Sequence, residues 1–319
     1  MKLSHVRKRL RSSLKSVYLD VGGANDAVVL AGMGRSGTTW LAELVNADGR
    51  DRIVFEPFFA ARVPEAAGFD YLQYLRPSQD APLLVGQARA ILAGKVRNAW
   101  VDRDNQGWFY RHRIIKDIRC NLMLAWLKAI APAIPIVLIV RHPLAVTASW
   151  LKLGWGKELD GDRTDVDILT AQPALFEDFP VLGDLLDAID PMSRFEQILF
   201  EWCVLHLVPY QQFQAGGAHL LFYENLVLQP ERELRSLFEF LQKPFDWGKM
   251  QSVVGSASST NFLKRSFRDD RMSQLDRWQE SFDAAQRDRA SQILARCGLD
   301  SFYNEAGQPA QIHVSTGRS

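Results

Sequence analysis

The sequence feature that most constrains the fold is the stretch from residue 28 to residue 45, VVLAGMGRSGTTWLAELV. Its apolar, β-branched start at residues 28–31 predicts a buried strand, and the glycines that follow predict a tight turn. Leucines then recur at helical spacing, so a helix should begin near Thr38. A strand, a glycine loop and a helix in this order direct backbone N–H groups and the positive end of a helix dipole toward one point. Such a point suits a phosphate group.

The cation of this loop distinguishes it from the loop of nucleoside triphosphatases. Gly32 and Gly37 have the G-x-x-x-x-G spacing of a Walker A loop, but Thr38 follows where those enzymes have a lysine. The cation lies inside the loop instead, at Arg35. The loop is therefore suited to a terminal phosphate ester that has no γ-phosphate behind it.

Residues 35–40 resemble the 5′-phosphosulfate-binding loop of sulfotransferases that use 3′-phosphoadenosine 5′-phosphosulfate (PAPS). The pattern of that family is a lysine or arginine, then Ser/Thr-Gly-Thr-Thr and an apolar residue. The resemblance runs with gaps from about residue 27 to residue 305, and it points to the carbohydrate and glycolipid branch in a soluble, bacterial-like form. It implies that the following residues bind PAPS: Arg35, Ser36, Gly37, Thr38, Thr39 and Trp40.

The order of apolar runs and helical patterns predicts the fold class. Short apolar strands are expected at 28–31, 52–55, 113–116, 136–140 and 219–223, with helical patterns at 39–46, 121–131, 144–152, 194–214 and 230–241. This alternation is typical of an α/β protein whose parallel sheet is covered on both faces. Together with the resemblance, it predicts a three-layer α/β/α, P-loop-like sulfotransferase fold. Ligands bind such sheets at the carboxyl ends of the strands.

The domain organisation follows from composition along the chain. We expect a basic amphipathic segment over residues 1–20 and one sulfotransferase domain over 21–319. Two stretches rich in proline and glycine, near 60–110 and 154–193, predict insertions that fold over the site and bind the acceptor.

A second candidate motif follows the fourth expected strand. Arg141 comes at the end of that strand, Pro143 suits the first turn of a helix, and Ser149 lies two turns further on. An arginine fork with a hydroxyl forms a reasonable clamp for a dianion. A magnesium-dependent triphosphatase would have an aspartate where Arg141 stands. The segment resembles the 3′-phosphate-binding motif of sulfotransferases, which implies that Arg141 and Ser149 hold the 3′-phosphate of PAPS.

The general base is where the sequence departs from the phenol and steroid sulfotransferases. Their base is a histidine two residues after a lysine at the end of the third strand, whereas this chain has Lys116, Asp117 and Ile118 there. Glu56 follows the second expected strand between apolar residues, so desolvation should raise its pKa toward that of a useful base. Carbohydrate sulfotransferases have a similar Phe-Glu-Pro with the glutamate as base. The resemblance thus implies Glu56, Arg35 and Lys116 as catalytic residues.

The assignments of Glu56 and Lys116 leave alternatives open. Glu56 is alternatively a capping or ion-paired residue, and Lys116 either assists the bridging oxygen or neutralises a neighbour. Residues 223–226, Tyr-Glu-Asn-Leu, resemble a family signature with a structural role. Asn261 to Arg265 and Trp278 resemble the carboxyl-terminal region of carbohydrate sulfotransferases, where Lys264 and Arg265 can approach the cofactor.

Composition excludes several classes of function. The 319 residues are 47% hydrophobic and 24% charged, which is ordinary for a globular protein. The net charge is +1, and six cations lie in the first 20 residues against Asp20 alone, so the rest is mildly acidic and nothing predicts nucleic-acid binding. The three cysteines predict no disulfide framework, no metal-ligand spacing occurs, and no signal peptide or membrane-spanning run is visible. These features predict a cytoplasmic protein with no metal.

The amino terminus allows two interpretations. Its apolar residues fall on one helical face with basic residues around the rest: Leu3, Val6, Leu10, Leu14 and Val17. That pattern is typical of a helix on an anionic membrane surface, here the inner one, reached through residues 1–19. The alternative is a solvated helix that packs its apolar face on the domain.

The sequence therefore predicts an enzyme that transfers a sulfuryl group from PAPS to a hydroxyl acceptor, on a sugar or glycolipid, without a metal. One alternative is a P-loop kinase of small molecules, which would need a lysine at position 38 and a magnesium-binding aspartate after a strand. The other is a non-catalytic nucleotide-binding protein of the same fold.

Overall fold

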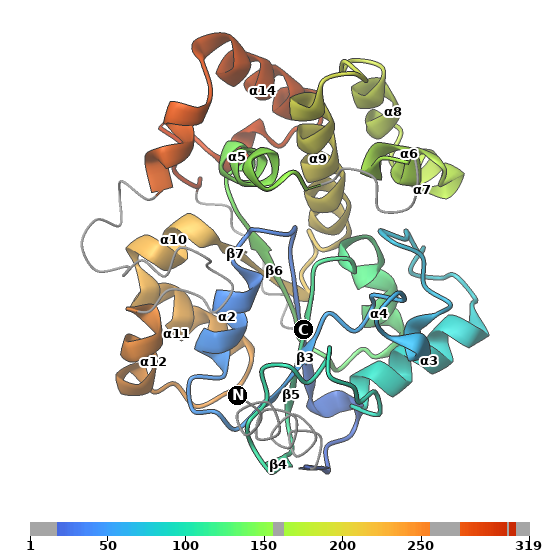
Figure 1. Cartoon of the computed structure of the whole chain (residues 1–319), viewed down its shortest axis with the longest axis vertical. Coiled ribbons are helices and arrows are strands. Elements are labelled where there is room, and N and C mark those ends of the chain that lie inside the picture. Colours follow the sequence, from blue (N-terminus) through green and yellow to red (C-terminus); the bar gives the residue numbers. More distant parts are fainter. Residues whose placement is uncertain (1–17, 156–162, 256–274, 305, 311–319) are drawn as a thin grey trace, which may run out of the picture.

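The computed structural model describes residues 18–155, 163–255, 275–304 and 306–310. Its centre is a five-stranded parallel sheet in the order β3-β5-β2-β6-β7 (Figure 1). The strands are β2 (Ala27–Ala31), β3 (Arg52–Phe55), β5 (Arg113–Asp117), β6 (Ile136–Val140) and β7 (Ala218–Phe222). All five predicted strands are confirmed, with ends that differ by at most one residue.

The strands are apolar on both faces because helices cover both. Along β2, Val28 and Leu30 pack into one hydrophobic cluster, whereas Val29 and Ala31 pack into the other. The first cluster includes α2 (Thr38–Val45), α10 (Tyr223–Leu228), α11 (Pro230–Phe240) and α12 (Trp247–Val254). The second includes α3 (Pro82–Leu92), α4 (Leu124–Ile130), α5 (Pro143–Leu153) and α9 (Arg194–Gln212). The predicted three-layer α/β/α class is confirmed.

A group of helices lies above the carboxyl ends of the strands (Figure 1). It contains α5 and α9 together with α6 (Asp165–Thr170), α7 (Pro173–Asp178), α8 (Val181–Leu186) and α14 (Ala284–Arg296). Short 3₁₀ helices connect the larger elements: η1 (Ala24–Asp26), η2 (Pro64–Ala66), η3 (Asn121–Met123), η4 (Arg277–Ser281) and η5 (Asp300–Phe302). The helix predicted over 121–131 is therefore divided, with η3 preceding α4.

The two predicted insertions carry secondary structure and contribute to the core. The first holds η2 and α3, and Ala88, Ile91 and Leu92 of α3 are fully buried. The second holds α6, α7 and α8, of which Leu169, Leu175 and Leu182 are fully buried. Their role in acceptor binding stays a prediction.

A second, two-stranded parallel sheet lies at the amino-terminal edge of the main sheet. β1 (Leu19–Asp20) pairs with β4 (Phe109–Tyr110). The Asp20 carboxylate is 1% exposed and accepts hydrogen bonds from Arg52 Nη1 at 3.0 Å and from Arg113 Nε at 2.7 Å. Since these arginines begin β3 and β5, the ion pairs bind residues 18–20 to the folded domain. The predicted domain boundary at residue 21 stays a prediction, and residues 18–20 contact the domain.

The described residues contain no helix that is long and apolar enough to cross a membrane. Cys120, Cys203 and Cys297 are buried free thiols.

Candidate active site

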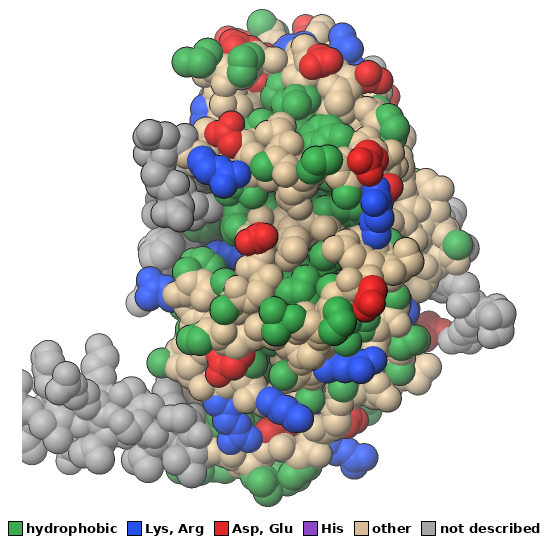
Figure 2. Space-filling view, turned by 90° about the vertical axis from the view of Figure 1, so that its right-hand side faces the viewer, with side chains coloured by type: hydrophobic (Ala, Val, Ile, Leu, Met, Phe, Trp, Pro, Cys, Tyr) green, Lys and Arg blue, Asp and Glu red, His purple; other side chains and the backbone are tan. Residues whose placement is uncertain are grey.

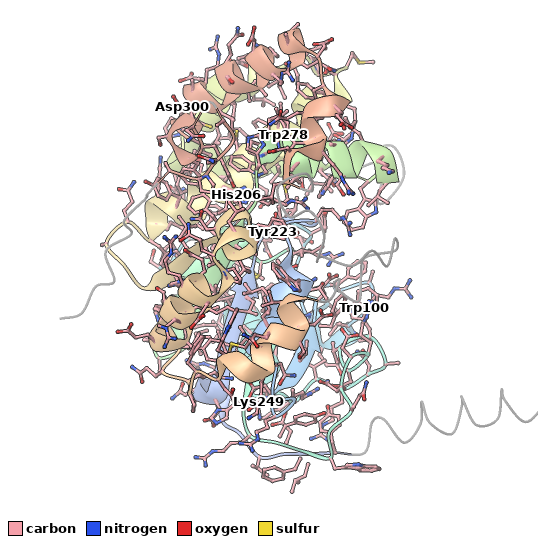
Figure 3. All side chains as sticks on the ribbon, turned by 90° about the vertical axis from the view of Figure 1, so that its left-hand side faces the viewer. Trp100, His206, Tyr223, Lys249, Trp278 and Asp300 are labelled. Atoms are coloured by element: carbon pink, nitrogen blue, oxygen red, sulfur yellow. The ribbon has the colours of Figure 1, made fainter. Side chains whose placement is uncertain are left out.

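The candidate site lies along the carboxyl ends of the five parallel strands. Glu56 follows β3, Asp117 ends β5, the glycine loop follows β2, and Arg141 follows β6. Tyr223 follows β7 and begins α10. In Figure 3, Tyr223 lies below Trp278, which belongs to the upper helical group. The chain reverses its direction across the sheet at β2, and ligands of open α/β sheets bind at such a point.

The glycine loop adopts a conformation that leaves its backbone open to a ligand. Gly37 caps α2 with φ of 93°, and no side chain caps this helix end. A Cβ atom there would lie 2.6 Å from Tyr223 Cδ2, and one on Gly32 would lie 2.6 Å from the Ile139 carbonyl oxygen. The first N–H groups of a helix have no intrahelical acceptor. The loop therefore offers the N–H groups at the start of α2 to an anion.

Two predicted cofactor motifs, more than 100 residues apart, meet at Arg35. Its Nε donates to Ser149 Oγ at 3.0 Å, and Arg141 Nη1 donates to the Arg35 carbonyl oxygen at 2.9 Å. The Arg141 guanidinium also lies 4.5 Å from the centre of the Tyr223 ring. Burial, and then the nearby Arg141 charge, lower the pKa of Arg35. Two neighbouring guanidinium groups of this kind favour an anion beside them.

Buried polar atoms beside the loop lack a protein partner. Among the described residues, Ser36 Oγ and Arg141 Nε are buried and make no hydrogen bond. Buried polar groups normally have a partner, and exceptions indicate a function or a missing ligand. Together with the open helix end and the two arginines, these donors fit phosphate esters such as those of PAPS.

The predicted base, Glu56, lies between two cations. Its Oε1 accepts a hydrogen bond from Lys116 Nζ at 2.6 Å, and its Oε2 accepts one from Arg119 Nη1 at 2.6 Å. Burial alone would raise the pKa of this carboxyl, but the Lys116 and Arg119 charges outweigh burial and lower it. The predicted rise of the pKa is therefore wrong, and the ion-paired alternative describes Glu56.

The backbone of Glu56 is held in an unusual conformation. Its φ is 44°, in the left-handed region, and Arg35 is likewise left-handed with φ of 74°. Such conformations cost about 1–3 kcal/mol each and occur often at functional sites. The Glu56 N–H donates to the Lys116 carbonyl oxygen at 2.7 Å, and Trp100 Nε1 donates to the Glu56 carbonyl oxygen at 3.2 Å. Bonds from β5 and from Trp100 therefore fix where the carboxylate points.

Sequence reasoning missed Arg119. Its only signal was a position three residues after Lys116, just beyond the strand. Asp117, which lies between them, accepts hydrogen bonds from the backbone N–H groups of Phe58 at 3.0 Å and Arg119 at 2.7 Å. Asp117 thus holds the two loops that carry Glu56 and Arg119, and its carboxylate is already engaged.

The remaining predicted residues have varied positions. Thr38 and Thr39 form the first turn of α2. Trp40 is buried, and its ring centre lies 5.8 Å from that of Tyr223. Its Nε1 donates a hydrogen bond to the Val253 carbonyl oxygen at 3.3 Å. The contact of these three residues with the cofactor stays a prediction. Lys264 and Arg265 lie outside the described residues.

The residues around Arg141 form a packed support. His142 stacks on Trp278 with ring centres 4.2 Å apart, and burial, followed by the Arg141 charge, lowers the pKa of His142 to about 3. Glu224 accepts hydrogen bonds from the His142 N–H at 2.9 Å and from the Tyr303 hydroxyl at 3.1 Å. These contacts agree with the structural role expected of residues 223–226.

A parallel sheet with an open glycine loop after its central strand, and arginines instead of a Walker lysine and aspartate, defines the P-loop-like transferases that bind phosphate esters. Within this class the family is clear, because residues 25–296 match the model of the sulfotransferase domain. The chain belongs to this family, which confirms the predicted enzyme class, PAPS-dependent sulfotransferase. No curated protein matches the chain significantly.

The chain also has distant similarity to three solved structures. The sulfotransferase domain from the curacin biosynthetic pathway has 15% identity and a TM-score of 0.45, over 86% of this chain and 98% of that one. A mouse sulfotransferase complexed with PAP has 14% identity and a TM-score of 0.46, over 93% and 91%. A sulfotransferase from Mycobacterium avium has 12% identity and a TM-score of 0.45, over 96% and 82%.

Proposed function

We propose that this protein transfers the sulfuryl group of PAPS to a hydroxyl group of a sugar or glycolipid, with Glu56 as the general base. A peripheral contact of residues 1–19 with a membrane surface is part of the proposal. The observation that carries the donor assignment is the junction of the glycine loop with Arg141 and Ser149 at Arg35. One clamp of this kind can hold both phosphates of a nucleoside bisphosphate.

Two groups of residues would bind the two phosphates of the donor. Ser36, Gly37, Thr38 and Thr39 would bind the 5′-phosphate through the loop and the start of α2, with Arg35 beside them. Arg141 and Ser149 would bind the 3′-phosphate through charge-assisted hydrogen bonds. PAPS, when bound, supplies a sulfuryl group whose leaving group is a phosphate. Positioning and stabilisation of negative charge on that phosphate are therefore the main demands on the protein.

The ion pairs of Glu56 suggest how the base becomes available. The Glu56 carboxylate has two cations within hydrogen-bond distance and a lowered pKa, which makes it a weak proton acceptor. An anionic sulfuryl group near Lys116 would compete for the Lys116 ammonium group. Glu56 would then lose part of its stabilising charge while it stays buried, and its pKa would rise. On this view Lys116 serves both the donor and the base.

The surroundings of Arg119 suit an acceptor that has both polar and apolar faces. The Arg119 guanidinium lies 4.0 Å from the centre of the Phe59 ring and 5.7 Å from that of Tyr71. Buried Asp165 and Glu201 each keep one carboxylate oxygen without a hydrogen bond, and burial raises the pKa of both. Aromatic rings beside hydrogen-bonding groups can bind the ring faces and hydroxyls of a sugar.

A binding experiment distinguishes this proposal from its alternatives. Adenosine 3′,5′-bisphosphate should raise the melting temperature of the protein more than adenosine 5′-phosphate does, and ATP with magnesium should have little effect. A kinase would show the reverse order. A non-catalytic protein would bind the bisphosphate yet fail to transfer label from radiolabelled PAPS to any member of a sugar and glycolipid library.

A further inference from the structure

The small β1–β4 sheet presents an apolar surface to solvent. Leu19, Val21, Trp108 and Phe109 are 58%, 53%, 67% and 58% exposed. They are four of the nine large hydrophobic side chains exposed in the described ranges, although they come from two short segments. Such clustering of exposed apolar groups indicates an interaction site.

The backbone explains why Leu19, Val21 and Phe109 point outward, whereas Trp108 lies just before β4 and is exposed without this alternation. Leu19 is the direct partner of Phe109, and the Leu19 and Val21 N–H groups donate to the carbonyl oxygens of Trp108 and Tyr110 at 2.9 and 3.0 Å. Residues alternate between faces along a strand, and here the inner face carries Tyr18, Asp20 and Tyr110. Because these inner residues are fixed by buried contacts, the outward face cannot turn inward.

Basic side chains surround this surface. Arg97 and Arg111 are exposed, and Arg97 donates to the Tyr18 carbonyl oxygen at 3.1 Å. Residues 1–17, which lead directly into β1, contain six lysines and arginines and no acidic residue. Figure 2 shows hydrophobic and basic side chains together at this lower end of the molecule.

We propose that the β1–β4 surface, defined as Leu19, Val21, Trp108 and Phe109 with Arg97 and Arg111, docks on an anionic lipid bilayer. Trp108 and Phe109 enter the headgroup region, where aromatic side chains are favoured. The arginines and the cations of residues 1–17 attract anionic headgroups. This site lies on the folded domain; it rests on the membrane contact of the proposed function and is independent of the sulfuryl transfer.

Docking in this way also bears on the acceptor. The surface lies at the amino-terminal edge of the main sheet, whereas the candidate active site lies at the carboxyl ends of its strands. Strands of five residues separate the two edges by about 17 Å. A docked enzyme therefore keeps its active site away from the bilayer, which favours a sugar in solution over a glycolipid in the same membrane.

The test is co-sedimentation of the full chain with phosphatidylcholine vesicles that contain or lack phosphatidylglycerol. The protein should bind the anionic vesicles at low salt and leave them at high salt. The double substitution Trp108→Ser and Phe109→Thr should weaken binding about tenfold or more, because two aromatic side chains no longer enter the bilayer. Leu83→Ser, which removes a 68% exposed leucine of α3, is the matched control and should bind like the unchanged protein.

Three results would overturn the proposal. The unchanged protein could fail to bind anionic vesicles, or the double variant could bind them as well as the control does. Gel filtration could instead show that the unchanged protein is a dimer and the double variant a monomer, in which case a second copy of the chain covers this surface. Circular dichroism establishes that each variant is folded before binding is compared.

Discussion

Lys116 Nζ lies 2.6 Å from Glu56 Oε1, on the face of the carboxylate that Arg119 leaves free. Burial lowers the pKa of Lys116, and Glu56 counteracts this only in part, so the lysine gains from any further anion. In the proposed function, the donor would compete with Glu56 for the Lys116 ammonium group and so weaken this ion pair. This relationship would link the binding of the donor to the availability of Glu56 as the base.

The first prediction concerns the base. Glu56→Gln preserves the shape of the side chain and removes its basicity, so the single-turnover chemical rate should fall about 10²–10⁴-fold. Affinity for adenosine 3′,5′-bisphosphate should stay within a few-fold. Glu65→Gln, at an exposed position of η2, is the control and should leave the rate unchanged. Near-normal chemistry in Glu56→Gln would eliminate Glu56 as the base.

The second prediction concerns the 3′-phosphate. Arg141→Ala should lose charge-assisted hydrogen bonds of about 1.5–3 kcal/mol. Affinity for adenosine 3′,5′-bisphosphate, measured by calorimetry, should then fall about 10- to 150-fold, while affinity for adenosine 5′-phosphate barely changes. Equal losses for the two ligands would mean that Arg141 shapes the loop through Arg35 and does not contact the 3′-phosphate.

The third prediction concerns stability in acid. Because the pKa of Glu56 is lower in the folded protein than in the unfolded chain, its ionised form stabilises the fold above the unfolded value of 4.5. That contribution is lost as the pH falls from there through the lowered folded pKa. The difference in melting temperature between the unchanged protein and Glu56→Gln should therefore shrink below about pH 4.5. A difference that is constant from neutral to acid pH would contradict the ion-paired state of Glu56.

The fourth prediction concerns the amino-terminal strand. Asp20→Asn removes the carboxylate that forms ion pairs with both Arg52 and Arg113, whose side chains are fully buried. Removing one partner of a buried ion pair costs about 3–5 kcal/mol, which urea denaturation will measure. Asp26→Asn, at a partly exposed position, serves as the control and should change stability by less than about 0.5 kcal/mol. A loss this small for Asp20→Asn as well would show that residues 18–20 contribute little to the fold.

The five strands and the glycine loop could be predicted because each leaves a local pattern, whereas the role of Arg141 and Ser149 stays a prediction. Apolar runs between turn residues mark the strands, and the loop and arginine motifs are short and contiguous. The charge state of Glu56 could not be predicted in the same way. Its sequence neighbours, Phe55 and Pro57, suggest an apolar site, but the cations that lower its pKa come from residues 60 and 63 positions later.

The small sheet was missed for a related reason. Each of its strands has two residues, which is too short for a period of two to be visible. Both residues of β1 therefore fell within the predicted amphipathic segment, residues 1–20. The pairing of β1 with β4 and the ion pairs of Asp20 with β3 and β5 assign this segment to the folded domain.

The ion pairs of Asp20 also have a consequence for biosynthesis. A carboxylate near the start of the chain leaves the ribosome well before Arg113, which is 93 residues further on. At typical rates of translation this interval lasts about 5–20 s. For that time the nascent strand has no partner in the sheet. With the docking proposed above, attachment to a membrane would precede the completion of the fold.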